Sequence, residues 1–328
     1  MGMQSRRILV TGATGQIGSE LIFELRKRHG SDNVVAAGHT KAPSGPLLDS
    51  GPFEYLDTSD KSAVEKVVEK YKINSIYHLA GILSAVGEKN PSLAWHVNME
   101  SLRNILEVAR ERKMDQVFWP SSIAVFGPET PRMNVPQETI LIPRTVYGIS
   151  KVAGELLCNY YFSRFGLDVR SLRYPGIISS ETPPGGGTTD YAVEIFYEAI
   201  EKKKYKCFVR KDTVLPMLYM PDCISATLEL MEADSSRIKV RTSYNLGGLS
   251  FSAEELANQI KKIIPEFVCS YEPDFRQKIA DSWPMSLDDK PARRDWGWKP
   301  AYDLRSMTED MVEKLSKRMV NNRERIKA

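Results

Sequence analysis

The sequence predicts an α/β protein, in which a doubly wound parallel sheet carries a smaller C-terminal lobe, and three observations support that prediction. Short β-branched runs alternate with longer amphipathic stretches over residues 1–175. A glycine-rich turn joins the first of these runs to the first amphipathic stretch. Beyond Tyr174 the alternation of strands and helices becomes less regular. This part contains fewer strand-like runs, and the segments that connect them are rich in proline and glycine. Strands that are separated by helices in this way indicate parallel βαβ units.

The individual elements follow from hydrophobic periodicity, taken in chain order. In the first half we expect strands at 7–12, 33–38, 53–56, 75–81, 116–121 and 168–174, and helices at 16–28, 60–71, 92–112 and 147–165. In the second half we expect helices at 190–203, 222–232, 252–263 and 303–318, with strands near 214–219 and 242–246. The charged tail "KRMVNNRERIKA" (317–328) is typical of a solvated, frayed helix end.

Composition and charge exclude several classes of function. A formal net charge of +3 over 328 residues gives no electrostatic reason to expect a nucleic-acid or membrane partner. The 4 cysteines lie far apart, so the spacing indicates neither a disulfide framework nor a metal site. No run approaches the roughly 20 apolar residues of a membrane helix, and "MGMQSRR" leads directly into a strand. We expect a cytoplasmic protein, and organelle targeting stays open because an Arg-rich leader could have been removed.

The stretch "ILVTGATGQIGSEL" places Gly12, Gly15 and Gly18 at a strand-to-helix junction. In such a turn the first glycine permits a tight bend, the second lets the backbone approach a pyrophosphate, and the third lets the helix pack on the strand. The motif indicates a Rossmann-type dinucleotide site. We therefore expect an NAD(P)-binding Rossmann domain over 1–175. Residues 176–328 should form mainly a substrate-binding lobe and C-terminal helices, from which the chain can return to the first domain.

The second half of the dinucleotide fingerprint is missing. An acidic residue normally follows about 20 positions after the glycines and holds the ribose hydroxyls of NAD. Here the position is Gly38, with His39 and Lys41 after it. The sequence thus leaves two alternatives open, namely NAD held by other groups, or NADP whose 2′-phosphate meets a basic residue. Asp57 is placed to touch the adenine, or to begin the helix near Asp60.

The stretch "RTVYGISKVAGELL" carries Tyr147 and Lys151 four residues apart, so both project from one helix face. An ammonium beside a phenol favours the phenolate, which could take a proton from a substrate hydroxyl while a hydride leaves for the cofactor. Upstream, "PSSIAVFG" ends a strand with Ser121 and Ser122 at the edge where ligands bind. A hydroxyl there can donate to the substrate oxygen.

Four of these blocks together, "TGATGQIG", "HLAG", "PSSIAVFG" and "YGISK", resemble the extended short-chain dehydrogenase/reductase superfamily, and "WGWKP" resembles a motif near its C-terminus. The resemblance implies that Ser122, Tyr147 and Lys151 are catalytic, with Ser121 as the neighbouring alternative hydroxyl. It also implies a homodimer that pairs through helices 92–112 and 147–165. The cofactor contacts that it implies come from Gly12, Gly15, Gln16, Ile17, Gly18, Gly38, His39, Asp57, Leu79, Ala80, Gly81, Asn98, Ser121, Tyr147, Lys151, Tyr174 and Ile177.

The segment after the sixth strand narrows the resemblance. "PPGGGTTDY", "GILSA", "FGPETP" and "DSWP" resemble the short-chain type of L-threonine 3-dehydrogenase. The resemblance implies oxidation of the β-hydroxyl of L-threonine to 2-amino-3-oxobutyrate with NAD. It also implies that Ser84 contacts the amino or carboxyl group of the substrate and that Trp283 closes over it.

The glycine run leads into a helix whose apolar residues recur at helical spacing from Ala192. A helix N-terminus suits a carboxylate, so we expect Thr188 and Thr189 to bind the carboxylate of an amino acid. Asp190 is either an ammonium ligand or the helix cap. By the same reasoning Asp222 is expected to cap the next helix, and His78 to be a structural group beside the cofactor.

Two alternatives stay open, one within the enzymes and one from a different class. One is a nucleotide-sugar epimerase or dehydratase of the same superfamily, although the glycine loop is short for a base and a diphosphate. The other is a non-catalytic redox sensor that binds a dinucleotide, although such proteins usually lack the Tyr/Lys pair. No metal is expected in any of these.

Overall fold

A computed structural model describes residues 6–185 and 187–327, and its centre is a seven-stranded parallel sheet of order β10-β6-β5-β4-β1-β2-β3. The α/β fold class with a doubly wound parallel sheet is confirmed. All seven strands of this sheet correspond to expected ones. The strands are β1 (Ile8–Thr11), β2 (Val34–Gly38), β3 (Phe53–Tyr55), β4 (Ser75–His78), β5 (Gln116–Ser122), β6 (Val169–Tyr174) and β10 (Tyr244–Asn245).

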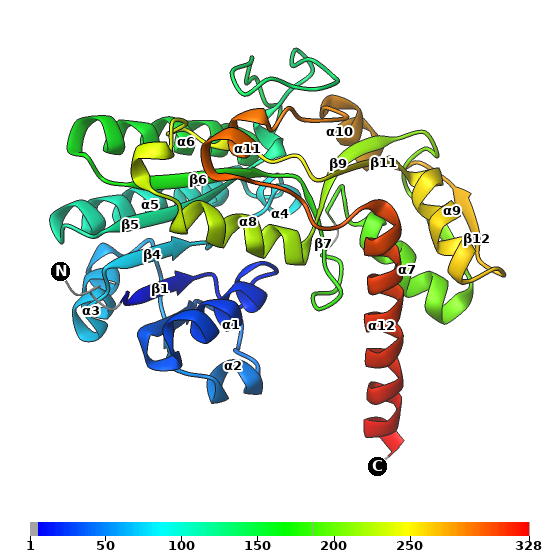
Figure 1. Cartoon of the computed structure of the whole chain (residues 1–328), viewed down its shortest axis with the longest axis horizontal. Coiled ribbons are helices and arrows are strands. Elements are labelled where there is room, and N and C mark those ends of the chain that lie inside the picture. Colours follow the sequence, from blue (N-terminus) through cyan, green and yellow to red (C-terminus); the bar gives the residue numbers. More distant parts are fainter. Residues whose placement is uncertain (1–5, 186, 328) are drawn as a thin grey trace.

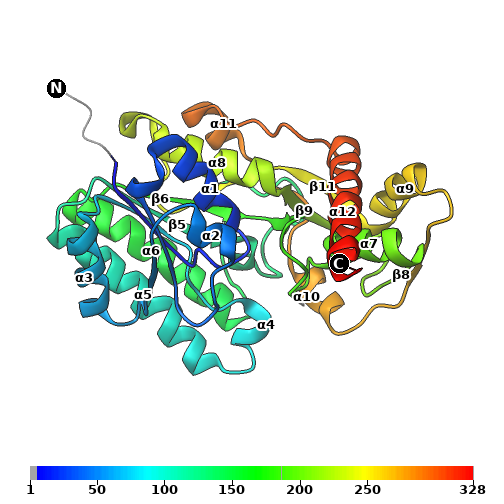
Figure 2. The same cartoon turned by 90° about the horizontal axis from the view of Figure 1, so that it is seen from below.

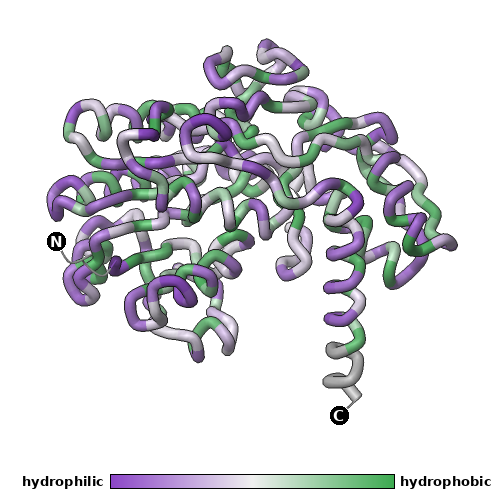
Figure 3. Tube along the Cα trace, in the orientation of Figure 1, coloured by the Kyte–Doolittle hydropathy of each residue, from purple (hydrophilic) through white to green (hydrophobic). Residues whose placement is uncertain are grey.

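Helices cover both faces of the sheet (Figure 2). One face packs against α3 (Lys61–Tyr71), α5 (Pro91–Glu111) and α6 (Val146–Phe165). The other packs against α1 (Gly18–His29), α8 (Met220–Glu232) and α11 (Lys290–Trp296). Figure 3 shows hydrophobic residues gathered along β1 and its neighbours and polar residues on the outer helices. Burial of the apolar helix faces on the sheet is the main force that holds these layers together.

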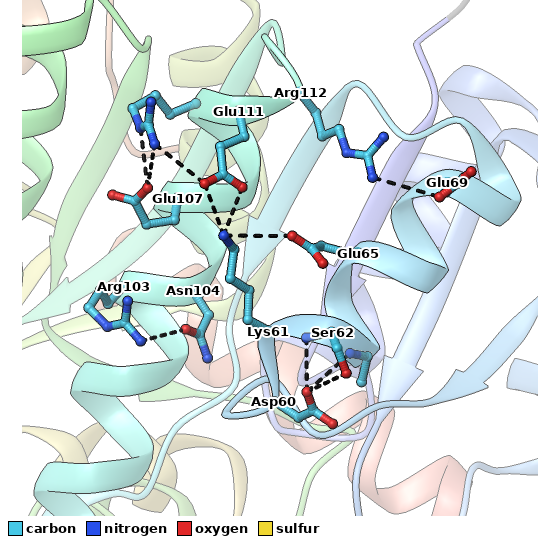
Figure 4. A network of polar contacts seen from close by, with 12 residues as sticks. Asp60, Lys61, Ser62, Glu65, Glu69, Arg103, Asn104, Glu107, Glu111 and Arg112 are labelled. Atoms are coloured by element: carbon cyan, nitrogen blue, oxygen red, sulfur yellow. Dashed lines mark hydrogen bonds and ion pairs between the residues drawn. The ribbon is translucent and has the colours of Figure 1, made fainter.

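The outer surfaces of α3 and α5 are joined by ion pairs (Figure 4). The Lys61 ammonium lies 2.8 Å from a Glu111 carboxylate oxygen and 3.6 Å from one of Glu65. All three side chains are 35–38% exposed, so this pairing contributes at most about 1 kcal/mol. The network orients two helices and lies on the surface of the sheet domain.

The smaller lobe lies beside the sheet (Figure 1). It contains a three-stranded sheet of order β11-β9-β7 and a two-stranded sheet of β8 and β12, packed with helices around one apolar core. Its strands are β7 (Gly176–Ile178), β8 (Lys204–Cys207), β9 (Val214–Tyr219), β11 (Leu249–Ser252) and β12 (Val268–Tyr271). Its helices are α7 (Tyr191–Lys202), α9 (Ala253–Ile263), α10 (Arg276–Ser282) and α12 (Leu304–Lys327). Between lobe segments the chain returns to the first domain as α8, β10 and α11.

Several short elements were not expected from the sequence. They are α2 (Gly45–Asp49), α4 (Ser84–Gly87), α10, α11 and the strands β7, β8, β11 and β12. The last helix was expected to end at residue 318 and continues to Lys327. No helix in the described part of the chain is both long and apolar enough to cross a membrane.

The expectation for Asp222 was wrong. Helix α8 begins at Met220, so Asp222 lies inside its first turn, and the structure gives no side-chain cap bond at the N-cap Tyr219. The Asp222 carboxylate instead accepts hydrogen bonds from the backbone amides of Ala301 (2.8 Å) and Tyr302 (3.2 Å). It therefore fastens the segment before α12 to α8.

Candidate active site

The glycine turn after β1 is shaped by close backbone contacts. Gly12 has φ 69°, and a Cβ there would lie 2.7 Å from backbone atoms of Leu79 and Ala80. A Cβ on Gly18 would lie 2.2 Å from the carbonyl oxygen of Gly12. Both positions therefore require glycine. The strand order reverses between β1 and β4, and ligands of open α/β sheets bind at that switch point.

The loop after β4 forms the opposite side of this crevice. The Asn98 side chain accepts a hydrogen bond from the amide of Ile82 (2.7 Å) and donates to its carbonyl (3.0 Å). A Cβ on Gly81 would lie 3.1 Å from the same Asn98 oxygen. Across the crevice the Gln16 amide donates to the Ile177 carbonyl (3.4 Å). A backbone cradle of this kind beside the N-terminus of α1 fits the pyrophosphate of a dinucleotide.

The end of β2 explains why Gly38 replaces the usual acid. A Cβ on Gly38 would meet the Thr14 side chain at 3.1 Å and the Phe53 ring at 3.2 Å. An acidic side chain at this position would need both neighbours to move. The next residue, His39, has a ring nitrogen 3.8 Å from the Asp57 carboxylate.

Asp57 is not the cap of the following helix. The N-cap of α3 is Asp60, whose carboxylate accepts from the Ser62 amide at 2.8 Å. Asp57 accepts from the amide (2.9 Å) and hydroxyl (2.7 Å) of Ser59. The Ser59 hydroxyl is the main reason that the pKa of Asp57 is lowered, so its carboxylate is charged at the edge of the crevice.

Tyr147, Lys151 and Ser122 converge at the carboxyl end of β5. Tyr147 and Lys151 lie in the first turns of α6, whose N-cap is Thr145. The Ser122 side chain lies beside the Tyr147 phenol and opposes the rise in its pKa, and the Ser122 hydroxyl accepts a hydrogen bond from the Ala124 amide (3.2 Å). The Lys151 ammonium donates to the Pro120 carbonyl (2.5 Å) and lies 5.5 Å from the centre of the Tyr147 ring.

Burial sets the ionisation of this pair. It raises the pKa of Tyr147 to about 12, against a lowering contribution from Ser122. It lowers the pKa of Lys151 to about 7. Strongly shifted pKa values of a phenol and an amine in contact range, here away from neutrality for the phenol and toward it for the amine, are typical of a proton-transfer site. The pair can act as a base only when the ammonium or another cation stabilises the phenolate.

The two serines of β5 are distinguished by the structure. Adjacent residues of a strand point to opposite faces. Ser122 meets Tyr147, whereas the Ser121 hydroxyl donates to the buried Glu155 carboxylate (2.6 Å). The Tyr174 hydroxyl is similarly engaged with Thr227 in the core. Any cofactor contact by Tyr174 would therefore come from its backbone.

Asp190 has a third role beyond the two that the sequence left open. It occupies the N-cap position of α7 but makes no side-chain cap bond. Its carboxylate accepts from the amides of Gly185 (2.6 Å) and Gly187 (2.9 Å). It therefore fastens the described ends of the glycine run. Gly186 lies outside the described residues.

The other expected substrate residues come from separate elements. Ser84 begins α4, and Thr189 packs its methyl group against β7, since a Cβ on Gly176 would lie 2.7 Å from it. Thr188 lies beside Thr189 in the turn before α7 and is half-buried. Trp283 follows α10, is 8% exposed and belongs to the core of the small lobe.

The segment after Trp283 is tied to the chain before α6. The Val135 amide donates to the Ser286 carbonyl (3.0 Å), and the Met285 amide donates to the Arg132 carbonyl (2.6 Å). Arg132 and Val135, which precede α6 in the chain, thus contact the segment that follows Trp283.

Sequence reasoning missed three polar residues beneath the site. Thr11 lies 2.7 Å from the His78 ring, and burial lowers the pKa of His78 to about 3, so this histidine is neutral. Glu155 and Arg173 form a buried ion pair at 2.7 Å. Glu155 follows Lys151 by four residues, a helix-face spacing that could have identified it.

No group of candidate metal ligands gathers within residues 6–185 and 187–327.

Comparison with known proteins gives concordant results. Residues 8–247 match the model of the NAD dependent epimerase/dehydratase family. An uncharacterised epimerase/dehydratase of Staphylococcus haemolyticus is 48% identical over 316 residues, which cover 96% of this chain and 99% of that protein. A GalE-like L-threonine dehydrogenase from Cupriavidus necator in its holo form superposes with a TM-score of 0.92 at 50% identity, covering 94% of this chain and 99% of the other. A monomeric L-threonine 3-dehydrogenase from a metagenome superposes with a TM-score of 0.90 at 49% identity, with the same coverage of 94% and 99%.

Proposed function

The chain belongs to the NAD-dependent epimerase/dehydratase family of the extended short-chain dehydrogenases/reductases, and from that premise we propose that it is an L-threonine 3-dehydrogenase. It oxidises the β-hydroxyl of L-threonine to give 2-amino-3-oxobutyrate. The observation that carries the proposal is the cluster of Tyr147, Ser122 and Lys151 beside a dinucleotide cradle, in a chain about half identical to L-threonine dehydrogenases.

The proposed mechanism assigns one task to each residue of the cluster. Ser122 donates a hydrogen bond to the hydroxyl oxygen of the substrate and steadies the developing alkoxide. Tyr147, as phenolate, takes the hydroxyl proton. Lys151 keeps that phenolate accessible near neutral pH through its positive charge. The bound dinucleotide supplies the acceptor for the hydride.

We propose NAD as the cofactor. The crevice bordered by Gly12, Gly18, Gly81 and Asn98 supplies the backbone that approaches the pyrophosphate. The charged Asp57 carboxylate supports NAD, because it would repel the 2′-phosphate of NADP. The His39 ring lies 3.8 Å from this carboxylate, so comparison of the two cofactors is part of the test below.

We propose that Ser84, Thr188 and Thr189 bind the carboxylate and ammonium of the substrate, while Trp283 bounds the site from the small lobe. Asp190 acts indirectly by holding the glycine run. We further propose that residues 1–175 form the cofactor-binding domain and that 176–328 supply mainly the substrate lobe.

Purified protein mixed with L-threonine and NAD is expected to produce reduced dinucleotide, measured by its absorbance. NADP is expected to support a lower kcat/KM. Turnover of UDP- or GDP-sugars without oxidation of threonine would replace the proposal by the epimerase alternative. Tight dinucleotide binding with no turnover of either substrate class would favour a sensor.

We also propose a homodimer that pairs through α5 and α6. Ile149, Leu156 and Tyr160 recur at the spacing of one helix face and are 47%, 61% and 50% exposed. Trp95 of α5 adds a 43% exposed indole. An exposed apolar stripe on two long neighbouring helices is suited to a second copy of the same surface.

Leu156→Glu is expected to shift this protein from dimer to monomer in sedimentation, with a dissociation constant raised by roughly 100-fold or more, because the interface would bury an unpaired carboxylate. Val268→Glu is the matched control, since Val268 is 62% exposed on β12 of the small lobe. A wild-type protein that sediments as a monomer, as the metagenome enzyme is described, would remove this part of the proposal.

A further inference from the structure

A third polar residue continues the catalytic face of α6. Tyr147, Lys151 and Glu155 follow each other at intervals of four residues, so they lie on one face of the helix. Glu155 is 1% exposed, and no step of the proposed mechanism uses it. A buried carboxylate needs a compensating partner, since an unpaired one is costly in free energy.

Both carboxylate oxygens of Glu155 are occupied. Arg173 of β6 donates from Nε to Oε1 (2.9 Å) and from Nη2 to Oε2 (2.7 Å). The Ser121 hydroxyl donates to Oε1 at 2.6 Å. Arg173 is held in turn by the Asn245 side chain (3.0 Å) and the Gln137 carbonyl (3.1 Å). The pair therefore joins α6, β5, β6 and β10 at one point beneath the site.

Within the described part of the chain, no carboxylate forms an ion pair with Lys151 in this arrangement. Its ammonium donates to the Pro120 carbonyl and lies 4.3 Å from the centre of the Trp119 ring. Pro120 immediately precedes Ser121, which Glu155 holds, and Ser122 follows. Glu155 is thus bonded to the residue that lies between the acceptor of Lys151 and Ser122.

We propose that the buried Glu155–Arg173 pair is a positioning element of the active site, in which Arg173 keeps the Glu155 carboxylate from binding Lys151 and so leaves the ammonium turned toward Tyr147. This inference rests on the proposed roles of Tyr147 and Lys151. Arg173 and Glu155 act through other residues, and neither contacts the reacting atoms in this scheme.

The charged groups around Lys151 make the inference testable, because they set the direction in which its pKa shifts when one of them is removed. Glu155 and Cys158 act on Lys151 from its own helix, and His78 faces it from β4. Burial raises the pKa of the Cys158 thiol, and His78 is neutral, so neither carries charge at neutral pH. Among these neighbours, Glu155, itself paired with Arg173, is therefore the charged residue that acts on Lys151.

Removing Glu155 and removing Arg173 should shift the apparent pKa of Lys151 in opposite directions. Glu155→Gln leaves the Arg173 cation uncompensated and should lower the apparent pKa of Lys151. Arg173→Met leaves the Glu155 anion uncompensated and should raise it. We expect displacements of roughly half a pH unit or more in each direction.

The experiment measures the rate at which Lys151 reacts with acetic anhydride as a function of pH, by peptide mass spectrometry on the whole protein. The pH dependence of kcat/KM for L-threonine is measured in parallel. The apparent pKa of its acid limb belongs to the coupled Tyr147–Lys151 pair and should shift in the same direction as the apparent pKa of Lys151. Arg170→Met is the matched control, because Arg170 lies on the same strand, is 1% exposed and pairs with Asp168 at 2.7 Å.

The outcomes distinguish a failure of this inference from a failure of the proposed function. Opposite displacements in the two variants, with none in Arg170→Met, support the inference even if threonine is not oxidised. Displacements in one direction, or none, overturn it even if the wild-type protein oxidises threonine. If Arg173→Met does not fold, the double variant Glu155→Gln/Arg173→Met replaces it. The double variant should bring the apparent pKa of Lys151 back toward the wild-type value relative to Glu155→Gln, and a value equal to that of the single variant contradicts the inference.

Discussion

Tyr147→Phe is expected to lower kcat for L-threonine by roughly 10²–10⁴-fold, because it removes the proposed acceptor of the substrate proton. The change deletes one oxygen and retains the ring, which packs against the core of the small lobe. Cofactor affinity should change little, because the dinucleotide cradle is formed mainly by the turns after β1 and β4. Steady-state kinetics and a binding titration with NAD measure the two effects separately.

The control for this variant is Tyr161→Phe. Tyr161 is a buried tyrosine of the same helix, and its hydroxyl bonds Glu107 away from the catalytic cluster. Like Tyr147→Phe, the Tyr161→Phe variant loses one tyrosine hydroxyl from α6, and it should keep normal turnover. Near-normal turnover by Tyr147→Phe would exclude Tyr147 as the base.

Gly18→Ala is expected to weaken NAD binding by roughly 10–100-fold, because a methyl group forced into a packed contact costs about 1–3 kcal/mol. The added Cβ would lie 2.2 Å from the Gly12 carbonyl oxygen and 2.9 Å from the Ala13 Cα, both backbone atoms. To relieve the contact, α1 must move away from β1. That movement displaces the helix N-terminus from the site of the pyrophosphate.

Gly45→Ala provides the comparison, since nothing lies within 4 Å of a Cβ at this first position of α2. It should bind NAD like the wild-type protein. Isothermal titration of all three proteins, with thermal unfolding to confirm that they are folded, measures the effect. Unchanged affinity in folded Gly18→Ala would show that the turn does not hold the cofactor.

The sheet strands and long helices could be predicted because their signals are local. Apolar runs such as 116–121 and the helical spacing over 147–165 correspond to β5 and α6 with shifts of one residue at their ends. The strands of the small lobe could not be predicted in the same way. The register of β12 on β8 pairs Val268 with Lys204, and β7 is only 3 residues long. Short strands depend on partners distant in sequence more than on their own pattern.

The sequence by itself determined the glycine turn and the Tyr147–Lys151 pair, because both depend on residues that are neighbours along the chain. Only the tertiary structure decided that Ser122 rather than Ser121 meets Tyr147, and that Asp222 holds the segment before α12. The carboxylates of Asp190 and Glu155 likewise obtained their partners from folding. The physical reason is that a polar side chain is directed by the donors that packing brings to it, and several of those donors lie on other elements of the chain.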